Sequence, residues 1–246
     1  MPVDRRWIGD AFPHRLPVGL RYWYFPPMSG EVVQHIAAGV YDFMMQPLER
    51  WRLGKIRTAL LGRASGDVLE VGAGSGVNLR YYDPRRLSSL TVSDYSDRLS
   101  LYRRRIERLG DGGWNVPVTT AQIDAQRLPF PENSFDTVVA TLVFCSVDCA
   151  PCGFDEILRV LRPDGQYLFL EHVRPTDGVA ARAFDFINPV WNRLSGGCNL
   201  NRDTLQAMRD AGLTVTMGEL SGESGSSWND SGRKGVFVWG EGQARA

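Results

Sequence analysis

The residues most suited to chemistry in this 246-residue chain are an acid and a run of glycines in its first half. Glu70 precedes Val71-Gly72-Ala73-Gly74-Ser75-Gly76, and the apolar residues 68–71 predict a short buried strand that leads into the run. Glycine suits such a turn because it adopts positive φ at little cost and has no Cβ to block a ligand. A strand, a glycine turn and a following helix, which we predict from Leu79 onward, together form a nucleotide-binding unit.

The spacing of the glycines and the acid before them narrow the kind of nucleotide. The glycines read Gly-x-Gly-x-Gly with Val77 next, so the dinucleotide pattern Gly-x-Gly-x-x-Gly is not met. A carboxylate at Glu70 disfavours a pyrophosphate and suits a ligand that carries a positive charge. An NAD-dependent oxidoreductase is therefore disfavoured.

Two further acids end predicted strands. Asp94 follows residues 90–93, close to where a ribose-binding acid belongs after a glycine turn, and its carboxylate can accept hydrogen bonds from both ribose hydroxyls. The alternative is that Asp94 caps a helix that begins near Asp97. Asp124 ends the predicted strand 116–123, where its carboxylate can accept a hydrogen bond from the exocyclic amine of adenine.

His172 is the candidate general base of the chain. It falls at the end of the predicted strand 166–173, and histidine titrates near neutral pH. The alternative is a histidine that only orders the loop after the strand. Cys145, which follows the predicted strand 137–143, either packs as a small apolar residue, as buried cysteines usually do, or lines a ligand channel.

Cys149-Ala150-Pro151-Cys152 has the C-x-x-C spacing of a redox pair or of half a metal site. Together with Cys145 and Cys198 it offers four ligands for zinc. No second C-x-x-C and no cluster of histidines accompanies it, so we predict no metal. The four cysteines are also too few for a disulfide framework in a chain of this length.

A parallel sheet is needed to bring these residues together, and the apolar runs predict one. Ligands bind at the carboxyl ends of the strands in such a sheet. We expect strands at residues 68–71, 90–94, 116–123, 137–143, 166–173, 213–220 and 235–240. We expect helices at residues 30–46, 48–61, 99–109, 154–161 and 203–211, and irregular structure from 176 to 201. The predicted fold class is α/β, a Rossmann-like seven-stranded sheet, mostly parallel with the last strand antiparallel and helices on both faces.

The first thirty residues differ from the rest of the chain. They hold five prolines and six aromatic residues. Proline at this density prevents a long helix, and so many aromatics are unusual in a solvated tail. The segment is either a wrap packed on the domain or an aromatic lid over a substrate pocket. We predict an N-terminal helical and aromatic unit at 1–62 and a ligand-binding domain at 63–246, with 174–201 as an insertion on the substrate side.

The bulk composition limits the partners. The formal net charge is zero, which argues against a nucleic-acid groove or an anionic membrane surface as the main partner. No stretch approaches the roughly 18 apolar residues of a membrane span, and no signal peptide precedes the first charges. We expect a cytoplasmic protein that acts on a small molecule.

Taken together, the motifs resemble those of the class I S-adenosylmethionine-dependent methyltransferases, whose sheet has seven strands with the last one antiparallel. The matching residues are Glu70–Gly76, Asp94, Asp124-Ala125, Leu128-Pro129-Phe130, Ser134-Phe135-Asp136 and Leu161–Gly165. The resemblance implies S-adenosylmethionine as cofactor, with Glu70 near its methionine end, Asp94 on the ribose and Asp124 on the adenine. The cofactor-binding residues are then Glu70, Gly72, Ala73, Gly74, Gly76, Asn78, Asp94, Tyr95, Asp124, Ala125, Gln126, Thr141 and Leu142.

Within this class the chain is more closely similar to the small alkyl-thiol S-methyltransferases. The residues that carry the similarity are Thr141–Val147, Glu171-His172-Val173, Pro189-Val190-Trp191 and Gly197–Leu200. The last two segments lie outside the cofactor half and bear on the substrate, so the similarity implies a small, largely apolar thiol as methyl acceptor. The candidates for the substrate pocket, each with a packing role as the alternative, are Tyr22, Tyr24, Tyr41, Cys145, Trp191 and Cys198.

Two alternative functions stay open. The menaquinone- and ubiquinone-type C-methyltransferases share the cofactor motifs, so a carbon or oxygen of a quinone or phenolic metabolite is the other possible acceptor. A thiol with a pKa of about 8.5 is partly ionised at neutral pH and makes a strong base optional, whereas a phenol with a pKa of about 10 needs more help. A protein that binds S-adenosylmethionine without turnover would keep Glu70 and Asp94 but block the pocket beyond them.

Overall fold

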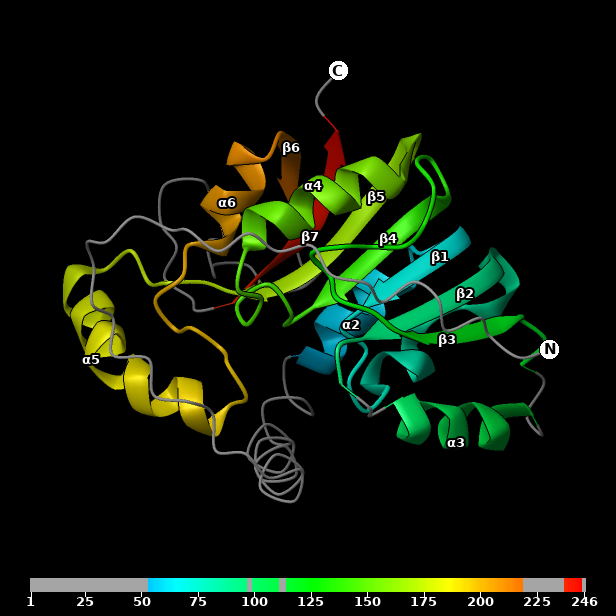
Figure 1. Cartoon of the computed structure of the whole chain (residues 1–246), viewed down its shortest axis with the longest axis horizontal. Coiled ribbons are helices and arrows are strands. Elements are labelled where there is room, and N and C mark those ends of the chain that lie inside the picture. The colour runs from blue at the N-terminus through cyan, green and yellow to red at the C-terminus, as the bar shows by residue number, and fades with distance from the viewer. Residues whose placement is uncertain (1–52, 97–98, 111–113, 219–236, 245–246) are drawn as a thin grey trace, which may run out of the picture.

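The chain folds around one seven-stranded sheet (Figure 1). The computed structural model describes residues 53–96, 99–110, 114–218 and 237–244. The strands are β1 (Gly66–Val71), β2 (Leu87–Asp94), β3 (Val118–Gln122), β4 (Phe135–Thr141), β5 (Leu161–His172), β6 (Leu213–Met217) and β7 (Phe237–Ala244). Their order is β3-β2-β1-β4-β5-β7-β6, and only β7 runs antiparallel to its neighbours. The predicted Rossmann-like fold is confirmed.

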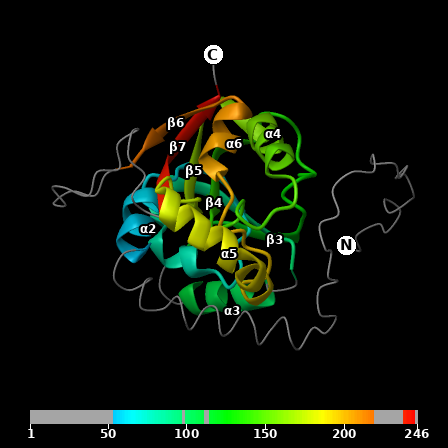
Figure 2. The ribbon, with the colours of Figure 1, turned by 90° about the vertical axis from the view of Figure 1, so that its left-hand side faces the viewer.

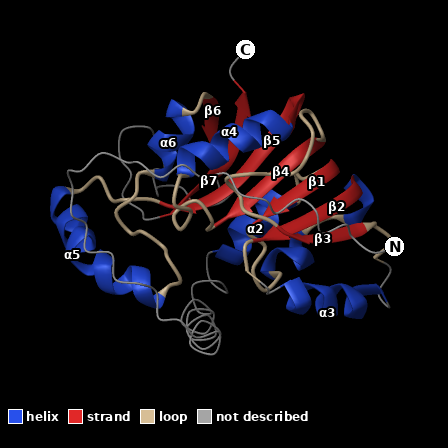
Figure 3. Ribbon diagram, in the orientation of Figure 1, coloured by secondary structure: helices blue, strands red, loops and turns tan. Residues whose placement is uncertain are grey.

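Helices cover both faces of the sheet (Figures 2 and 3). The helices are α2 (Gly54–Leu61), α3 (Leu99–Gly110), α4 (Ala150–Val160), α5 (Gly178–Leu194) and α6 (Thr204–Asp210), with short 3₁₀ helices η2 (Val77–Tyr81) and η3 (Pro84–Arg86). α4 and α6 contribute to one apolar core, and α2, α3 and η2 contribute to a second core on the other face. α5 lies apart from both, on the side where β5 ends (Figure 1).

The middle of the sheet is apolar on both faces because helices cover it on both sides. Val138, Val139 and Ala140 of β4 are fully buried. In β1, Leu69 belongs to the core under α4, whereas its neighbour Val68 belongs to the core under α2. Alternate residues of a strand point to opposite faces, so the β1 acid next to Leu69 enters the α2 side.

The helix predicted after the glycine turn is replaced by the two 3₁₀ helices. η2 ends at Tyr81, and Tyr82 is already extended, with φ −72° and ψ 142°. Pro84 explains the early stop, because a proline disfavours helical geometry in the residue before it. That residue, Asp83, caps η3 instead by accepting a hydrogen bond from the backbone N–H of Arg85.

The prediction of irregular structure over 176–201 is wrong for most of that segment, because α5 occupies 17 residues of it. Asp177 caps the helix by accepting hydrogen bonds from the backbone N–H groups of Val179 and Ala180. Pro189 lies inside α5. A proline removes one helical hydrogen bond, yet the helix continues past it to Leu194.

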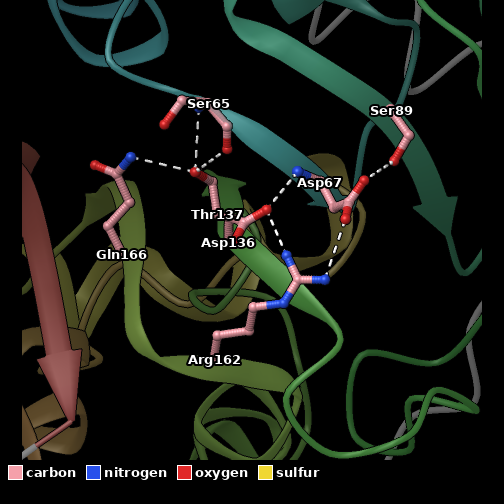
Figure 4. Close-up of polar contacts among 7 residues, drawn as sticks. All are labelled: Ser65, Asp67, Ser89, Asp136, Thr137, Arg162 and Gln166. Atoms are coloured by element: carbon pink, nitrogen blue, oxygen red, sulfur yellow. Dashed lines mark hydrogen bonds and ion pairs between the residues drawn. The ribbon is translucent and has the colours of Figure 1, made fainter.

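Polar side chains tie the strands together near the amino ends of β1 and β4 (Figure 4). The Arg162 guanidinium contacts the carboxylates of Asp67 and Asp136, and the Ser89 hydroxyl donates to Asp67. Thr137 donates to the backbone oxygen of Ser65. This network lies at the edge of the sheet opposite to the glycine turn, so its residues are useful controls for the site described below.

Several predictions fall on residues that the structure does not describe. The aromatic lid at 1–30, the first predicted helix, and the pocket candidates Tyr22, Tyr24 and Tyr41 all lie outside the described residues. The end of the proposed N-terminal unit is described as α2, which buries Ile56, Leu60 and Leu61 in the core under it. Within the described part of the chain, no helix is both long and apolar enough to span a membrane.

Candidate functional site

The three glycines of the turn after β1 all have positive φ, at 66°, 54° and 79° for Gly72, Gly74 and Gly76. A Cβ on Gly72 would lie 2.5 Å from a methyl group of Val143, and one on Gly76 would lie 2.7 Å from the ring of Tyr102. A Cβ on Gly74 would meet nothing within 4 Å. Gly72 and Gly76 are therefore required by packing, whereas Gly74 faces open space at the carboxyl edge of the sheet.

Asp94 holds the glycine turn against the end of β2. Its Oδ2 accepts a hydrogen bond of 2.7 Å from the backbone N–H of Gly74, and its Oδ1 accepts one of 2.8 Å from the N–H of Ser96. The carboxylate thus lies beside the open space at Gly74. Next to it, the Tyr95 side chain is 77% exposed.

Asp124 lies after β3, beyond Asp94 along the same edge. Its carboxylate accepts hydrogen bonds from the backbone N–H of Gln126 at 2.9 Å and from the side-chain amide of Gln126 at 3.0 and 3.2 Å. The Gln126 oxygen in turn accepts a hydrogen bond of 2.8 Å from the N–H of Cys149. Ala125 between them is buried. Gln126 therefore connects Asp124 to the start of α4.

Glu70 is fully buried under the glycine turn. Its carboxylate accepts hydrogen bonds from the Asn78 amide at 2.9 Å and from the hydroxyls of Tyr82 and Tyr102 at 3.1 and 3.3 Å. Burial raises the pKa of Glu70 to about 7, against the opposing effect of these hydrogen bonds. In this arrangement Glu70 fixes Asn78, at the start of η2, in the layer beneath the turn.

Arg57 is a site residue that the sequence analysis missed. Its guanidinium donates to the side-chain oxygen of Asn78 and, at 2.8 Å, to the Thr141 hydroxyl. Asn78 donates to the same Thr141 oxygen at 3.0 Å. Glu70 and the end of β4 are thereby connected through one polar network. The signal in the sequence is an arginine next to Ile56 in α2, which the structure buries in contact with polar partners.

Leu142 directly follows β4 and has a φ of 60°. A bulky residue with positive φ is a steric outlier, and such strain concentrates at functional sites. Its backbone N–H donates a hydrogen bond of 2.7 Å to the Leu170 oxygen of β5. The strained residue turns the chain at the edge of the sheet, next to the glycine turn, since Val143 packs against Gly72.

Glu171 is a second buried carboxylate, and the sequence analysis gave it no role. It accepts hydrogen bonds from three successive backbone N–H groups, at 3.0 Å from Val143, 3.0 Å from Phe144 and 3.3 Å from Cys145. Burial raises the pKa of Glu171 to about 8, although the three hydrogen bonds oppose this. Glu171 thus fixes the loop between β4 and α4 to the end of β5.

The structure brings together three of the predicted pocket residues, Cys145, Cys198 and Trp191. Both thiols are buried. The hydrogen bond between them raises the pKa of Cys145 well above its usual value and, together with a hydrogen bond from Trp191, lowers the pKa of Cys198. Asn199 donates two hydrogen bonds to the Cys145 backbone oxygen, at 2.9 and 3.1 Å. The segment after α5 is therefore docked on the loop after β4.

His172, the candidate base, is enclosed by aromatic rings at the end of β5. It stacks on Phe184 of α5 with ring centroids 6.1 Å apart and meets the edge of Phe237 at 5.6 Å. Burial lowers the pKa of His172 to about 4, so its imidazole is neutral near pH 7. Among the described residues, its buried Nδ1 has no hydrogen-bond partner.

Cys149 and Cys152 form a disulfide at the start of α4. Cys145 and Cys198 do not join them. These two cysteines are free thiols, and they are hydrogen-bonded to each other. Within the described ranges, no three His, Cys, Asp or Glu side chains are grouped so that they could hold a metal ion.

Comparison with known proteins points to one domain family. Residues 69–169 match the family model described as "Methyltransferase domain". The chain is 32% identical over 162 residues to the thiol S-methyltransferase TMT1B of Homo sapiens, an alignment that covers 60% of this chain and 61% of the relative. It is 31% identical over 171 residues to the ubiquinone/menaquinone biosynthesis C-methyltransferase UbiE of Pseudomonas putida, with 67% of this chain and 66% of the relative covered. The matched region is thus less than two thirds of either relative.

A solved structure shares the fold. The structure of a geranyl diphosphate methyltransferase in complex with SAM superposes with a TM-score of 0.60 and 20% sequence identity, over 86% of this chain and 95% of that one. At this identity the likeness concerns the fold alone.

Proposed function

We propose that this protein, whose residues 69–169 match a methyltransferase domain, is an S-adenosylmethionine-dependent methyltransferase that transfers a methyl group to a small, largely apolar acceptor. The favoured acceptor is a thiol sulfur. The observation that carries the proposal is the open space at Gly74, which has the Asp94 carboxylate beside it and Asp124 farther along the same edge of the sheet.

The residues at this edge fit a nucleoside that carries a charged sulfonium. Asp94 can accept hydrogen bonds from ribose hydroxyls, and Asp124 can accept one from an adenine amine. The exposed ring of Tyr95 can cover an adenine face. The partly exposed Thr141, at the end of β4, and Leu142, directly after it, lie at the same edge. Glu70 and Asn78 form the layer beneath, and the Glu70 carboxylate adds negative charge when it is ionised, on the side where a positive group would lie.

The bound sulfonium supplies an already activated methyl group. This chain must therefore supply alignment and the exclusion of water, which are together worth about 7–11 kcal/mol in well-oriented reactions. The loop after β4 is suited to this task because Glu171 fixes three of its N–H groups and Asn199 fixes its Cys145 oxygen. A loop held at both its donors and its acceptors keeps one geometry while the acceptor binds.

A thiol acceptor is supported by the segments that would surround it. The buried Cys145 and Cys198 and the half-buried Trp191 lie together as a weakly polar cluster, and they belong to the segments similar to the alkyl-thiol enzymes. α5 adds exposed apolar side chains nearby in the sequence, namely Val179, Phe186, Ile187, Val190 and Leu194. One relative is named a thiol S-methyltransferase.

Methylation of carbon or oxygen on a quinone or phenol is the second candidate, because another relative is named as a quinone-pathway C-methyltransferase. Turnover of a panel of alkyl thiols, phenols and quinones, measured as S-adenosylhomocysteine produced, separates the two. We expect the apolar thiols to give the highest kcat/KM. Turnover confined to the quinones would overturn the thiol assignment, and no turnover with any class would leave a binding protein without activity.

Replacing Gly74 with alanine is expected to weaken S-adenosylhomocysteine binding at least about tenfold, a cost of about 1.4 kcal/mol. The new methyl group enters the open space that the nucleoside would occupy. Gly196→Ala is a matched control, because Gly196 also has a positive φ, of 73°, and open space at its Cβ. Both variants lose about 1 kcal/mol of stability from backbone strain, but the control should keep its affinity in calorimetry. Equal affinities in both variants would contradict the assignment.

Replacing His172 with alanine is expected to lower kcat for a thiol by about 100-fold if the imidazole takes the thiol proton. Because burial holds the pKa of His172 at about 4, the imidazole stays neutral across neutral pH. Protonation of His172 should therefore lower kcat near pH 4 and not near pH 6.5. The measurement is kcat against pH for the wild type and the variant, with thermal unfolding as the control for folding. Identical profiles would remove His172 from the reaction and leave it an ordering role beside Phe184.

The cytoplasmic location expected from the sequence stays a prediction. Fractionation of cells that express the tagged full-length protein tests it.

A further inference from the structure

The C-x-x-C motif at the start of α4 has no role in the function proposed above. Cys149 and Cys152 are joined in a disulfide, with Cys149 at the N-cap of the 11-residue helix α4. Cys152 is exposed and Cys149 is partly exposed, whereas the other two cysteines are buried. Cys149 and Cys152 are therefore the cysteines that reagents in solution can reach, among the residues that the structure describes.

We propose that Cys149 and Cys152 are a thiol–disulfide exchange site for low-molecular-weight thiols, and that their oxidation state controls the adenine end of the nucleoside site. The second half of the proposal rests on the proposed function.

The position of Cys149 favours exchange. The backbone N–H of Cys152 points at the Cys149 sulfur from 3.3 Å, in the way an N-cap side chain is bound. A helix N-terminus and a donated hydrogen bond both stabilise a thiolate. A sulfur that leaves as a stabilised thiolate leaves faster. The exposed Cys152 is then the sulfur that is attacked, and Cys149 is the sulfur that leaves.

Small thiols are the reductant that opens the disulfide, in two exchange steps. A thiolate from solution attacks Cys152 Sγ, which breaks the bond to Cys149 and leaves Cys149 as a thiolate and Cys152 in a mixed disulfide. A second thiolate attacks the external sulfur of that mixed disulfide and releases Cys152 as a thiolate. Two small thiols become one small disulfide, and the two protein thiolates take up the two protons released. Oxidation by a small disulfide is the reverse.

A direct hydrogen-bond path links this site to Asp124. The Cys149 backbone N–H donates to the Gln126 oxygen at 2.8 Å, and the Gln126 amide donates to the Asp124 carboxylate at 3.0 and 3.2 Å. The disulfide closes a ring over residues 149–152, which restrains the first turn of α4 that presents this N–H. Opening the ring frees that turn, so Gln126 and Asp124 lose part of their fixed geometry.

Thiol trapping in redox buffers tests the exchange. The full-length protein is equilibrated with mixtures of reduced and oxidised dithiothreitol, alkylated while folded, and mapped by mass spectrometry. We expect Cys149 and Cys152 to gain label together as the buffer becomes reducing, while Cys145 and Cys198 stay unlabelled. In Cys152→Ser, the Cys149 thiol should stay labelled in every buffer. Labelling of the pair only under unfolding conditions, or full labelling in oxidising buffer, would overturn the exchange site.

Calorimetry on the same samples tests the coupling. We expect the reduced protein to bind S-adenosylhomocysteine at least about fivefold more weakly than the oxidised protein, the low end of typical coupling between sites. The double variant Cys149→Ser, Cys152→Ser should bind equally in both buffers. Equal affinity of the two wild-type forms would overturn the coupling. An absence of binding in either form would instead count against the proposed function, and the trapping result would still decide the exchange.

Discussion

Replacing Asp94 with alanine is expected to weaken S-adenosylhomocysteine binding by about 100-fold, because hydrogen bonds to a charged group contribute about 1.5–3 kcal/mol each. The substitution removes the acceptor proposed for the ribose hydroxyls. It also removes the acceptor of the Gly74 N–H at 2.7 Å and of the Ser96 N–H, so the glycine turn loses its attachment to β2. Calorimetry with the full-length protein measures the change.

Asp67→Ala is the matched control for Asp94→Ala. Asp67 also accepts hydrogen bonds, from the Ser89 hydroxyl and from Arg162, but it lies at the opposite edge of the sheet (Figure 4). We expect this variant to be less stable in urea and to keep the wild-type affinity. Similar losses of affinity in the two variants would show that Asp94 acts through general stability and has no direct role in binding.

Replacing Glu171 with alanine is expected to lower the free energy of unfolding by about 3–5 kcal/mol, which is at the high end for a single substitution. The three N–H groups of Val143, Phe144 and Cys145 would lose their shared acceptor in a buried place. Urea denaturation at pH 7 measures the loss. Glu132→Ala, at an exposed glutamate, should change the free energy by no more than about 0.5 kcal/mol. A comparable value for Glu171→Ala would contradict the anchoring role.

The same carboxyl group predicts a dependence of stability on pH. The pKa of Glu171 is raised to about 8 in the folded chain from a value of 4.5, so the folded state binds this proton more tightly than the unfolded state. Its contribution to stability is present below pH 4.5 and is lost as the pH rises to about 8. The difference in free energy of unfolding between the wild type and Glu171→Gln isolates this contribution. We expect the wild type to lose stability relative to Glu171→Gln as the pH rises from 5 to 8.

Two other groups shape the pH profile of the wild type. Glu70, with a pKa raised to about 7, acts in the same direction as Glu171. His172, with a pKa lowered to about 4 from 6.5, acts the opposite way, because its contribution is lost as the pH falls through that range. A difference between wild type and Glu171→Gln that stays flat across pH 5 to 8 would mean that Glu171 is ionised throughout.

The sequence by itself determined the fold class and the edge of the sheet where the chemistry lies. Buried strands appear in the sequence as apolar runs, such as residues 68–71. The glycine turn follows directly on its strand, and Asp94 ends the next one. Such features depend on residues close together in sequence, so they can be inferred without coordinates. α5 was missed because Pro189 disfavours a helix locally, whereas in the structure the helix continues through Pro189 to Leu194.

Only the tertiary structure decided which buried groups meet. Arg57 reaches Thr141 from a helix that precedes the sheet, Glu171 binds a loop that lies before it in the chain, and Cys145 pairs with Cys198. It also decided that His172 is neutral and that Gly74, alone among the glycines of its turn, borders open space. Burial and contacts between distant residues set these properties, because the desolvation of a charge depends on everything packed around it and not on its neighbours in sequence.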